Sequence, residues 1–559
     1  MQTAEHRATR APGALAPPHT PPSVRGPRHT HPPAVEEAQA SVADAAFRHK
    51  WPIAFGVILA AVMELVDSSI VNVAFSQMSG NLGATIDEIT WVAVGYILAA
   101  VIVLPMTGWL AARFGRKRYF LTSVAVFTVA SVLCGMATSL EGLVFWRIVQ
   151  GLGGGALIAT SQAILYESFP PNEKAMASAL FGIGMMVGPA LGPTMGGIIV
   201  ERYTWPWIFL VNVPLGLVAF GLVAVYFRPD PPRAADVGKV DVLGFALLAA
   251  GIGSLQFVLE RGEHYDWFSS RLIIGLAGTA AVALVSMVWW EMRTPTPVLD
   301  LRVFRHRSLM AATISATAVG MALYGSVFAL PLYMQSLLRY TAETAGWVLF
   351  PSAVASAISM LSAARLLKVI PAPWIVAGGT LVLATSMFMH GTLTTESGRG
   401  DMLLPVVLRG LGFGLIFVPI TTVAFVGLAP REMPHAAALF NLSRQLGGSV
   451  GIALVATQLI TATARHRAAL VEHVTVYDEV TREQLAGMTA QLRTKGPDDF
   501  TAAGRALGLL DHRVQVQAQM LAYRDAFGFL GFVVLGSLPL VLLLRRSTGT
   551  GGGPPVDVH

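Results

Sequence analysis

The sequence is poor in cysteine and in charge. Cys134 is the single cysteine among 559 residues and lies in an apolar stretch, which excludes an intramolecular disulfide and a cysteine-based metal site. Charged residues make up 13% of the chain, about half the share found in an ordinary soluble protein. Hydrophobic residues make up 54%. A soluble core cannot bury that much apolar surface, so the composition predicts a protein that lies in a lipid bilayer.

Catalytic and cofactor-binding patterns are also absent from the sequence. No Ser/His/Asp constellation and no His/Glu zinc spacing occurs in a soluble segment. The stretches GLGGGA at 151–156 and GLGFG at 410–414 superficially resemble dinucleotide-binding fingerprints, but both lie within apolar runs and follow no strand. We therefore expect no enzymatic activity, no metal and no bound cofactor.

The two ends of the chain lack long apolar runs. Residues 1–50 are rich in Pro, His, Ala and Arg and predict a disordered cytoplasmic tail, and residues 546–559 predict a second tail. No signal peptide is expected, because the first long apolar run begins only at Trp51. The net charge of +6 would favour nucleic acid in a soluble protein. Here the basic residues stand between apolar runs, so we expect a membrane and no nucleic acid as the partner.

Apolar segments of about 20 residues recur from Trp51 onward, the length needed to cross ~30 Å of hydrocarbon. We expect fourteen of them. The first six cover 51–74, 90–112, 119–138, 141–166, 174–200 and 206–227, a pair covers 240–260 and 271–290, and the last six cover 308–336, 344–368, 373–391, 402–428, 434–462 and 525–545. The sequence therefore predicts an all-α polytopic membrane protein.

Basic residues in the short connections predict the orientation of these spans. With the N-terminus in the cytoplasm, the inside connections and the C-terminal tail hold seventeen basic residues and the outside short connections hold five. We expect a multi-pass protein of the inner (plasma) membrane with both termini cytoplasmic.

One outside connection, 465–522, is unusually long and carries seven basic and seven acidic residues. The pattern from Tyr477 to Leu492 and from Phe500 to Leu521 predicts short amphipathic helices. Its balanced charge favours a docking surface for a periplasmic partner. A tolerated insertion is the alternative, because long surface loops cost little stability.

Ionisable residues lie inside the first and the fourth predicted spans. Glu64 and Asp67 are three residues apart on one face of the first span, and Arg147 lies in the fourth. A charge at bilayer depth costs at least ~2.5–3.5 kcal/mol, so it needs a partner or a water-filled cavity. At 1.5 Å per residue, Asp67 lies ~12 Å and Arg147 ~9 Å from the same side. The sequence therefore predicts that Asp67 and Arg147 pair.

Two interpretations of this charged group stay open. Protonation of a carboxylate would release Arg147, which makes the group a proton-coupled switch. Alternatively, the pair is a fixed ion pair that only joins two helices. The second acid, Glu64, favours the switch because the sequence shows no fixed partner for it.

Glycine recurs every fourth residue in the fifth span, GIGMMVGPALGPTMGG. Such a stripe permits close helix contact, and the two prolines within it remove backbone donors and bend a helix. The residues of this motif are Gly184, Gly188, Pro189, Gly192, Pro193, Gly196 and Gly197.

The turn between the second and third spans, GWLAARFGRKR, is rich in glycine and positive charge. Four charges in a short connection serve as a topology signal, but the flanking glycines favour a tight, docked turn with a gating role. Its candidate residues are Gly108, Arg113, Gly115, Arg116 and Lys117.

Polar and aromatic residues scattered through the spans are candidates for a substrate cavity. An apolar cavity with few directional groups suits varied lipophilic compounds, although each of these residues is equally compatible with helix packing. The candidates are Asn72, Gln150, Gln162, Tyr324, Phe328, Asn441, Arg444 and Gln445.

Several motifs together resemble the major facilitator superfamily, and within it the fourteen-helix drug:proton antiporters of the EmrB/QacA type. The resemblance runs from Trp51 to Arg546. The segments that carry it are LVDSSIVNVAF at 65–75, TWVAVGYILA at 90–99, RIVQGLGGG at 147–155, VGPALGPTMGG at 187–197, WPWIFLVNVPLG, DVLG, LDLRVFRHRSL and NLSRQLGGSVGIAL. Two positions depart from the family pattern: Ala112 replaces an acid, and Pro206 interrupts a WRW pattern.

The resemblance implies both a fold and a mechanism. It implies two six-helix bundles, 51–227 and 308–545, with two additional transmembrane helices in the linker 228–307, fourteen in all. It implies multidrug efflux of lipophilic compounds by alternating access, driven by the proton gradient, with Asp67, Glu64 and Arg147 in proton coupling. In some Gram-negative relatives a periplasmic adaptor protein and an outer-membrane channel also take part.

Two alternatives remain at this stage. One is a dedicated exporter of a single natural product such as a fatty acid or siderophore. The other is a membrane sensor or scaffold, against which stands the absence of a recognisable soluble signalling domain.

Overall fold

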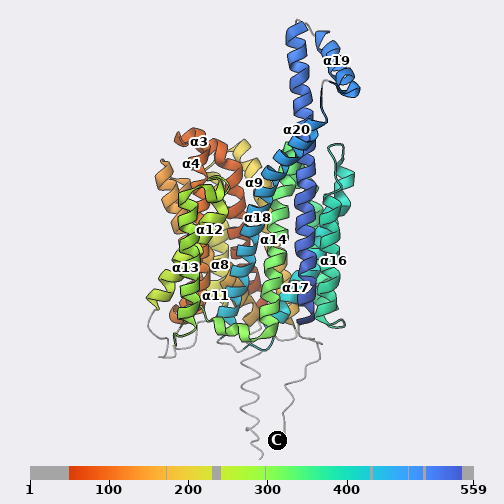
Figure 1. Ribbon diagram of the computed structural model, residues 1–559. Helices are drawn as coiled ribbons and strands as arrows, with labels where there is room; N and C mark the ends of the chain where they lie inside the picture. The colour runs from red at the N-terminus through yellow and green to blue at the C-terminus, as the bar shows by residue number, and fades with distance from the viewer. Residues whose placement is uncertain are drawn as a thin grey trace, which may run out of the picture. The chain divides into compact units, whose positions relative to one another are not determined.

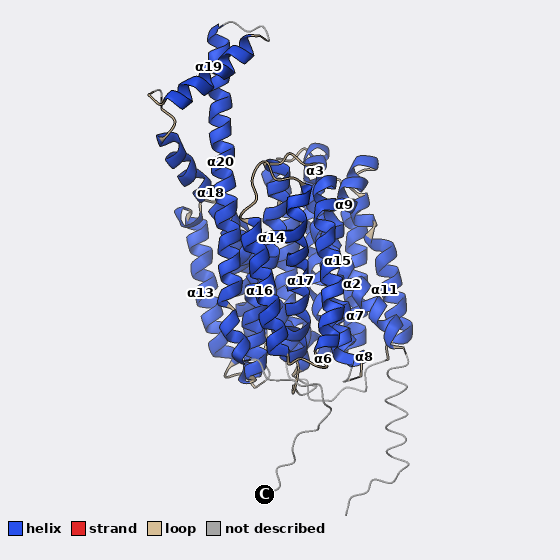
Figure 2. Cartoon of the chain, turned by 90° about the vertical axis from the view of Figure 1, so that its right-hand side faces the viewer, coloured by secondary structure: helices blue, strands red, loops and turns tan. Residues whose placement is uncertain are grey.

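A computed structural model of the chain describes residues 49–170, 173–228, 241–295, 297–428, 432–475, 477–494 and 499–543. The predicted tails therefore lie outside the described residues, apart from His49 and Lys50. Within the described ranges every regular element is a helix (Figures 1 and 2). The described residues form one compact unit. Because the two predicted bundles are not separated within this unit, their borders at 227 and 308 stay a prediction.

Each predicted span of the first half has a helical counterpart. The helices are α2 (Lys50–Ile70, continued by η1, Val71–Ala74), α3 (Phe75–Leu82), α4 (Ile86–Ile89), α5 (Trp91–Val103, continued by η2, Leu104–Met106), α6 (Thr107–Phe114), α7 (Arg116–Gly135), α8 (Leu140–Ser168), α9 (Lys174–Arg202), α10 (Trp207–Leu210) and α11 (Asn212–Tyr226). Pro105 stands where α5 gives way to η2, and Pro206 precedes the short α10, as expected of a residue without a backbone N–H.

The second half repeats this all-helical pattern. Its helices are α12 (Val242–Arg261), η4 (Trp267–Ser269), α13 (Arg271–Glu291), η5 (Leu301–Arg305), α14 (Arg307–Ser336), α15 (Ala342–Leu366), α16 (Ala372–His390), α17 (Arg399–Ala424), α18 (Met433–Glu472), α19 (Glu479–Arg493), α20 (Asp499–Gly536) and η6 (Leu538–Leu543). Thirteen helices of the described residues are long and apolar enough to cross a membrane. The remaining predicted span, 174–200, coincides with the 29-residue helix α9.

Packing of the helices follows two groups. In the first, α2 contacts α8, α9 and α11, and α8 contacts α5 and α7; in the second, α14 contacts α18, α17 contacts α15 and α16, and α20 contacts α16 and α18. The groups meet where α9 packs on α15 and α17 and where α18 packs on α6 and α8. The additional helices α12 and α13 pack on each other, and α12 also contacts α5 and α18.

The ends of the spans define two faces of the molecule. We use the term N-terminal face for the side where α2 begins and the α6–α7 turn lies, and the term distal face for the side where α2 ends. Figures 1 and 2 show α18 and α20 continuing past the other helices at the distal face, with α19 beside them.

The two helices expected within 465–522 are present, as α19 and as the first part of α20, but the second of them is neither short nor separate from the following span. α18 continues to Glu472 and α20 starts at Asp499, so both spans extend outward as unbroken helices, and only α19 is a separate short helix. Hydropathy marks where apolar character ends, whereas good helix formers such as Ala, Arg, Leu and Glu continue the backbone helix beyond that point. We refer to residues 463–524 as the distal extension.

The distal extension has a small core of its own. Met488, Ala506 and Leu510 are buried there, with Leu485 and Leu492 packed against them. Side-chain contacts also join α18 to α20: Arg467 forms an ion pair of 2.7 Å with Asp511, and His466 lies 2.8 Å from Asp525 at the base of the extension. The extension is therefore a packed helical structure.

Candidate functional site

The predicted pair of Asp67 and Arg147 is present in the structure. Nη1 of Arg147 on α8 lies 2.6 Å from Oδ2 of Asp67 on α2, and the exposed fractions of the side chains are 1% and 0%. The prediction of this pair, made from the depth of each residue along its helix, is thus confirmed for two residues that are 80 positions apart in the chain. This buried ion pair joins α2 to α8.

Further donors and acceptors saturate the pair. Oδ1 of Asp67 accepts hydrogen bonds from Nδ2 of Asn212 (2.6 Å) and from Nε2 of Gln150 (3.0 Å). Arg147 donates to Oε1 of Gln150 (2.8 Å) and, through Nε, to the carbonyl of Val92 (3.0 Å). Its guanidinium also lies 4.2 Å from the ring centre of Tyr96. Buried charges are tolerated where hydrogen bonds satisfy them in this way.

Glu64 lies one helical turn away in a different environment. Its Oε1 accepts a hydrogen bond of 3.1 Å from the Tyr96 hydroxyl, whereas its Oε2 is buried and has no hydrogen-bond partner. Arg147 and Arg444 are close enough for an electrostatic interaction with it. No fixed partner for Glu64 was evident from the sequence, and the structure shows a partner for only one of its two oxygens. Of the two acids, Glu64 is the one with room for a proton.

The glycine stripe of α9 faces α2. A side chain at Gly184 would lie 2.8 Å from Ile58, one at Gly188 would meet Leu65, and one at Gly192 would meet Ser69. A side chain at Gly196 would lie 2.9 Å from Ile70, whereas Gly197 has nothing within 4 Å. The close contact predicted for the stripe is therefore present at all four of the glycines that recur every fourth residue, and Gly197 lies outside it. The side chains of Pro189 and Pro193 lie outside the described residues.

The turn between α6 and α7 is docked as predicted. Gly115 has φ of +86°, a conformation that favours glycine. Lys117 donates to the carbonyls of Ala224 (2.7 Å) and Phe227 (2.5 Å) at the end of α11, where a cation complements the helix dipole. Arg116 pairs with Glu167 at the end of α8. Gly108 is buried within α6, and Arg113 is exposed in its last turn. The turn thus joins the ends of three helices.

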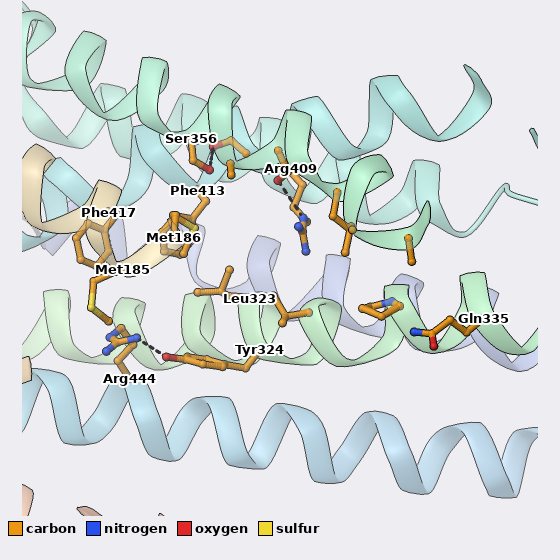
Figure 3. Close-up of a pocket in the computed structure, with 18 residues that line it drawn as sticks. Met185, Met186, Leu323, Tyr324, Gln335, Ser356, Arg409, Phe413, Phe417 and Arg444 are labelled. Carbon is orange, nitrogen blue, oxygen red and sulfur yellow. Dashed lines mark hydrogen bonds between the residues drawn. The ribbon is translucent and has the colours of Figure 1, made fainter. Parts of the chain in front are cut away.

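A cavity of about 130 Å³ lies between the two groups of helices. Its walls come from α9, α14, α15, α17 and α18 and are mostly apolar (Figure 3). On α14 it runs from Leu323 to Gln335, ~18 Å along the helix, from mid-span towards the distal face. The volume is below the roughly 300–1,000 Å³ of typical ligand pockets. A drug-sized compound therefore requires the walls to move apart.

The predicted cavity residues separate into different environments. Tyr324 and Arg444 line the cavity, and Arg444 donates to the Tyr324 hydroxyl at 2.9 Å. Gln150 belongs to the ion-pair network instead. The remaining candidates lie outside the cavity wall: Asn72 is exposed, Phe328 and Gln445 are half-buried, and Gln162 and Asn441 are buried against each other.

Contacts across the two helix groups close the N-terminal side. Nδ2 of Asn441 on α18 donates to Oε1 of Gln162 on α8 at 2.6 Å. The hydroxyls of Ser178 on α9 and Thr422 on α17 lie 3.3 Å apart. The ring of Tyr166 on α8 meets that of Phe425 beyond α17 at 5.4 Å. The cavity is thus separated from the N-terminal face and directed towards the distal face.

Sequence reasoning missed three residues of the site. Asn212 and Tyr96 bind the acids of α2, but an amide or a phenol in an apolar run has many possible roles and gives little signal. Arg409 lines the cavity at 8% exposure. It is a charge inside the apolar run LLPVVLRGLGFG, so the argument applied to Arg147 would have found it.

Comparison with known proteins gives consistent matches. The family model described as Major Facilitator Superfamily matches residues 57–452. The chain is 34% identical to the multidrug export protein EmrB of Haemophilus influenzae over 85% of this chain and 93% of that protein. It is 32% identical to the fatty acid resistance protein FarB of Neisseria gonorrhoeae over 89% of this chain and 96% of that protein.

A solved structure matches the fold. The crystal structure of the human organic anion transporter MFSD10 (TETRAN) aligns with a TM-score of 0.53 at 12% identity, covering 87% of this chain and 99% of that one. At this identity the likeness concerns the arrangement of helices alone, and it agrees with the all-α transporter fold expected from the sequence.

Proposed function

Because the chain belongs to the major facilitator superfamily, we propose that it is a proton-coupled antiporter that exports lipophilic or amphiphilic compounds by alternating access. The protein is a multi-pass inner-membrane protein of a family that transports small molecules. The likeness to multidrug export proteins over most of the chain supports multidrug efflux. The observation that carries the proton coupling is a buried acid with one unpartnered oxygen, Glu64, beside the saturated pair of Asp67 and Arg147.

In the proposed mechanism Glu64 binds and releases the proton. Protonation gives its Oε2 a hydrogen to donate and removes the attraction to Arg147 and Arg444, which lie nearby. The pair of Asp67 and Arg147 holds α2 against α8. A change in the charge of Glu64 therefore acts on α2 while this ion pair keeps α2 in contact with α8. No bound cofactor takes part, since the proton gradient supplies the free energy.

The route from the acids to the other half of the molecule runs through α9. The glycine stripe brings α9 against α2, and α9 in turn packs on α15 and α17. A shift of α2 therefore changes the surface between the two helix groups. Interfaces of this kind favour discrete arrangements over continuous deformation, which suits alternation between two open states.

The orientation follows the distribution of basic residues, with the N-terminal face and both termini in the cytoplasm. The cavity then opens towards the periplasm, and the contacts of Gln162 with Asn441 and of Ser178 with Thr422 form the closed cytoplasmic gate. The distal extension projects on the periplasmic side, where it would dock a periplasmic adaptor protein that leads to an outer-membrane channel.

A second candidate is a dedicated exporter of one natural product, such as a fatty acid or siderophore. The observation in its favour is the likeness to a fatty acid resistance protein, which equals the likeness to EmrB in extent. The two candidates differ in the range of compounds exported, whereas the proton coupling is common to both.

The test is transport by the purified protein in liposomes. An imposed pH gradient should drive the movement of several lipophilic compounds against the direction of proton flow, and an uncoupler should abolish it. Movement of a single compound from the panel would favour the dedicated exporter. Transport that is indifferent to the gradient and to the uncoupler would refute proton coupling.

A further inference from the structure

Arg409 is a buried cation on the cavity wall. It lies in the middle of α17, with Pro405 and Phe413 one turn away on either side, and only 8% of it is exposed. Its side chain points from α17 into the space in front of α14 (Figure 3). An arginine at this depth is rare in a transmembrane helix and marks a functional position unless a partner neutralises it.

No such partner is present among the described residues. Nε of Arg409 lies 3.4 Å from the hydroxyl of Ser352, and Nη1 lies 3.3 Å from the hydroxyl of Ser326. Both distances are at the long end for hydrogen bonds, and no carboxylate forms an ion pair with it. The nearby titratable group is His390 on α16, which is not an anion. Arg147 is different, because a carboxylate lies 2.6 Å away.

The Arg409 guanidinium therefore has N–H groups that make no hydrogen bond to a described residue. Arginine carries five N–H groups in a planar fork, and the two serines engage two of them. Three N–H groups are left without a partner within the described ranges, next to empty space. This arrangement matches a carboxylate, which arginine binds through two parallel hydrogen bonds.

The rest of the cavity specifies the body of the ligand. Met185, Leu323, Leu349, Phe413 and Phe417 present apolar surface, and no described residue of its wall is acidic. Arg444 adds a second positive charge, whose Nε has no hydrogen-bond partner. Two cations in an apolar cavity attract an anion and repel a cation.

We propose that this cavity binds amphipathic organic anions, with the acidic group on the Arg409 guanidinium and the apolar body along the walls of α14 and α17. The proposal rests on the proposed function in one respect, namely that the occupant of the cavity is the cargo. It names the substrate class that the proposed function left open. Ser352 belongs to the same subsite, because its hydroxyl lies beside the guanidinium on the cavity wall.

The test compares two probes that share an apolar body and differ in charge. They are 2-naphthoate and the neutral 2-naphthamide, whose binding to the full-length protein in lipid nanodiscs is measured by fluorescence anisotropy. We expect the wild type to bind the acid more tightly than the amide by about tenfold or more. Equal affinity for the two probes, or no binding of the acid, would overturn the proposal without any variant.

Variants then locate the subsite. Arg409→Gln should weaken the binding of naphthoate about tenfold and leave that of naphthamide within about twofold. Arg409→Lys should keep part of the affinity, since charge remains while the planar fork is lost. The matched control is Arg399→Gln on the same helix, where the arginine is exposed and lies outside the cavity. Unchanged naphthoate binding by Arg409→Gln, or equal weakening of both probes, would mean that Arg409 only joins helices through its serines.

Binding and transport also separate this proposal from the proposed function. Selective binding of the acid without proton-driven transport would leave the anion site standing and refute the antiport. Proton-driven transport with no preference for the acid would support the antiport and refute the anion site.

Discussion

At the scale of single residues, the two acids of α2 divide the work that the sequence assigned to them jointly. Asp67 accepts three hydrogen bonds, from Arg147, Gln150 and Asn212, so both of its oxygens are bound by donors. Glu64 accepts one hydrogen bond, from Tyr96. The fixed-pair interpretation therefore describes the contacts of Asp67, and the switch interpretation describes those of Glu64.

The first prediction concerns Asp67→Asn. The amide keeps the shape but presents an uncharged group to Arg147, and breaking a buried ion pair from one side costs about 3–5 kcal/mol. We expect proton-coupled export to be lost while the protein still inserts into the membrane. The measurement is proton uptake per exported compound in liposomes, with membrane insertion checked by fractionation. Wild-type stoichiometry in the variant would contradict the role of this pair.

The second prediction concerns Glu64→Gln. Glutamine keeps an oxygen for the Tyr96 hydroxyl but cannot exchange a proton, so the hydrogen bond survives while the titration is removed. We expect transport driven by a pH gradient to fall at least about tenfold. Exchange of labelled for unlabelled compound at equal concentrations should persist, because it needs no net proton movement. If both activities fell together, Glu64 would be part of substrate binding or of the fold.

At the scale of the helix, the contact of α2 with α9 leaves no space for side chains. The third prediction is that Gly188→Leu and Gly192→Leu impair transport, because a side chain there would meet Leu65 or Ser69 on α2. The matched control is Gly197→Leu on the same helix, where nothing lies within 4 Å. Transport rates and expression of the three variants are the measurement. Equal behaviour of Gly188→Leu and Gly197→Leu would remove the stripe from the mechanism.

The fourth prediction concerns the distal extension. Its core of Met488, Ala506 and Leu510 lies away from the cavity, so we expect that replacing 470–518 by a short Gly/Ser linker leaves transport in liposomes intact. Resistance of intact Gram-negative cells should fall, because the docking surface for the adaptor is lost. Unchanged resistance would support the tolerated insertion, and lost transport in liposomes would place the extension in the transport cycle.

At the scale of the whole molecule, the closed side is held by contacts between the two helix groups. The fifth prediction is that cysteines at Ser178 and Thr422 form a disulfide on oxidation, because the two hydroxyls lie 3.3 Å apart. The link should stop transport, and a reducing agent should restore it. The native Cys134 is buried on α7, so the single variant Ser178→Cys serves as the control. Full transport with the link formed would mean that this contact does not open during the cycle.

The sequence predicted the fold well because lipid imposes few solutions. Length and hydropathy located thirteen helices that are apolar enough to cross a membrane, and the remaining predicted span coincides with α9. The cost of buried charge, combined with helix rise, paired Asp67 with Arg147. Hydropathy did not predict that α18 and α20 continue beyond their apolar stretches. It indicates which residues lie in lipid, but a helix can continue through polar residues outside the lipid. The contact between Asn212 and Asp67 was not predicted either, because the position of an amide along its own helix does not show which residue of a neighbouring helix it faces.

The continuity of α18 and α20 has a mechanical consequence. α18 has 40 residues and is therefore ~60 Å long, about twice the thickness of the hydrocarbon layer. With no break between the two parts, the outer half works as a lever arm attached to the C-terminal helices. A tilt of about 10° at the membrane displaces a tip ~30 Å away by about 5 Å. A small change in the tilt of α18 within the membrane therefore becomes a larger displacement of α19 and of any protein bound to it.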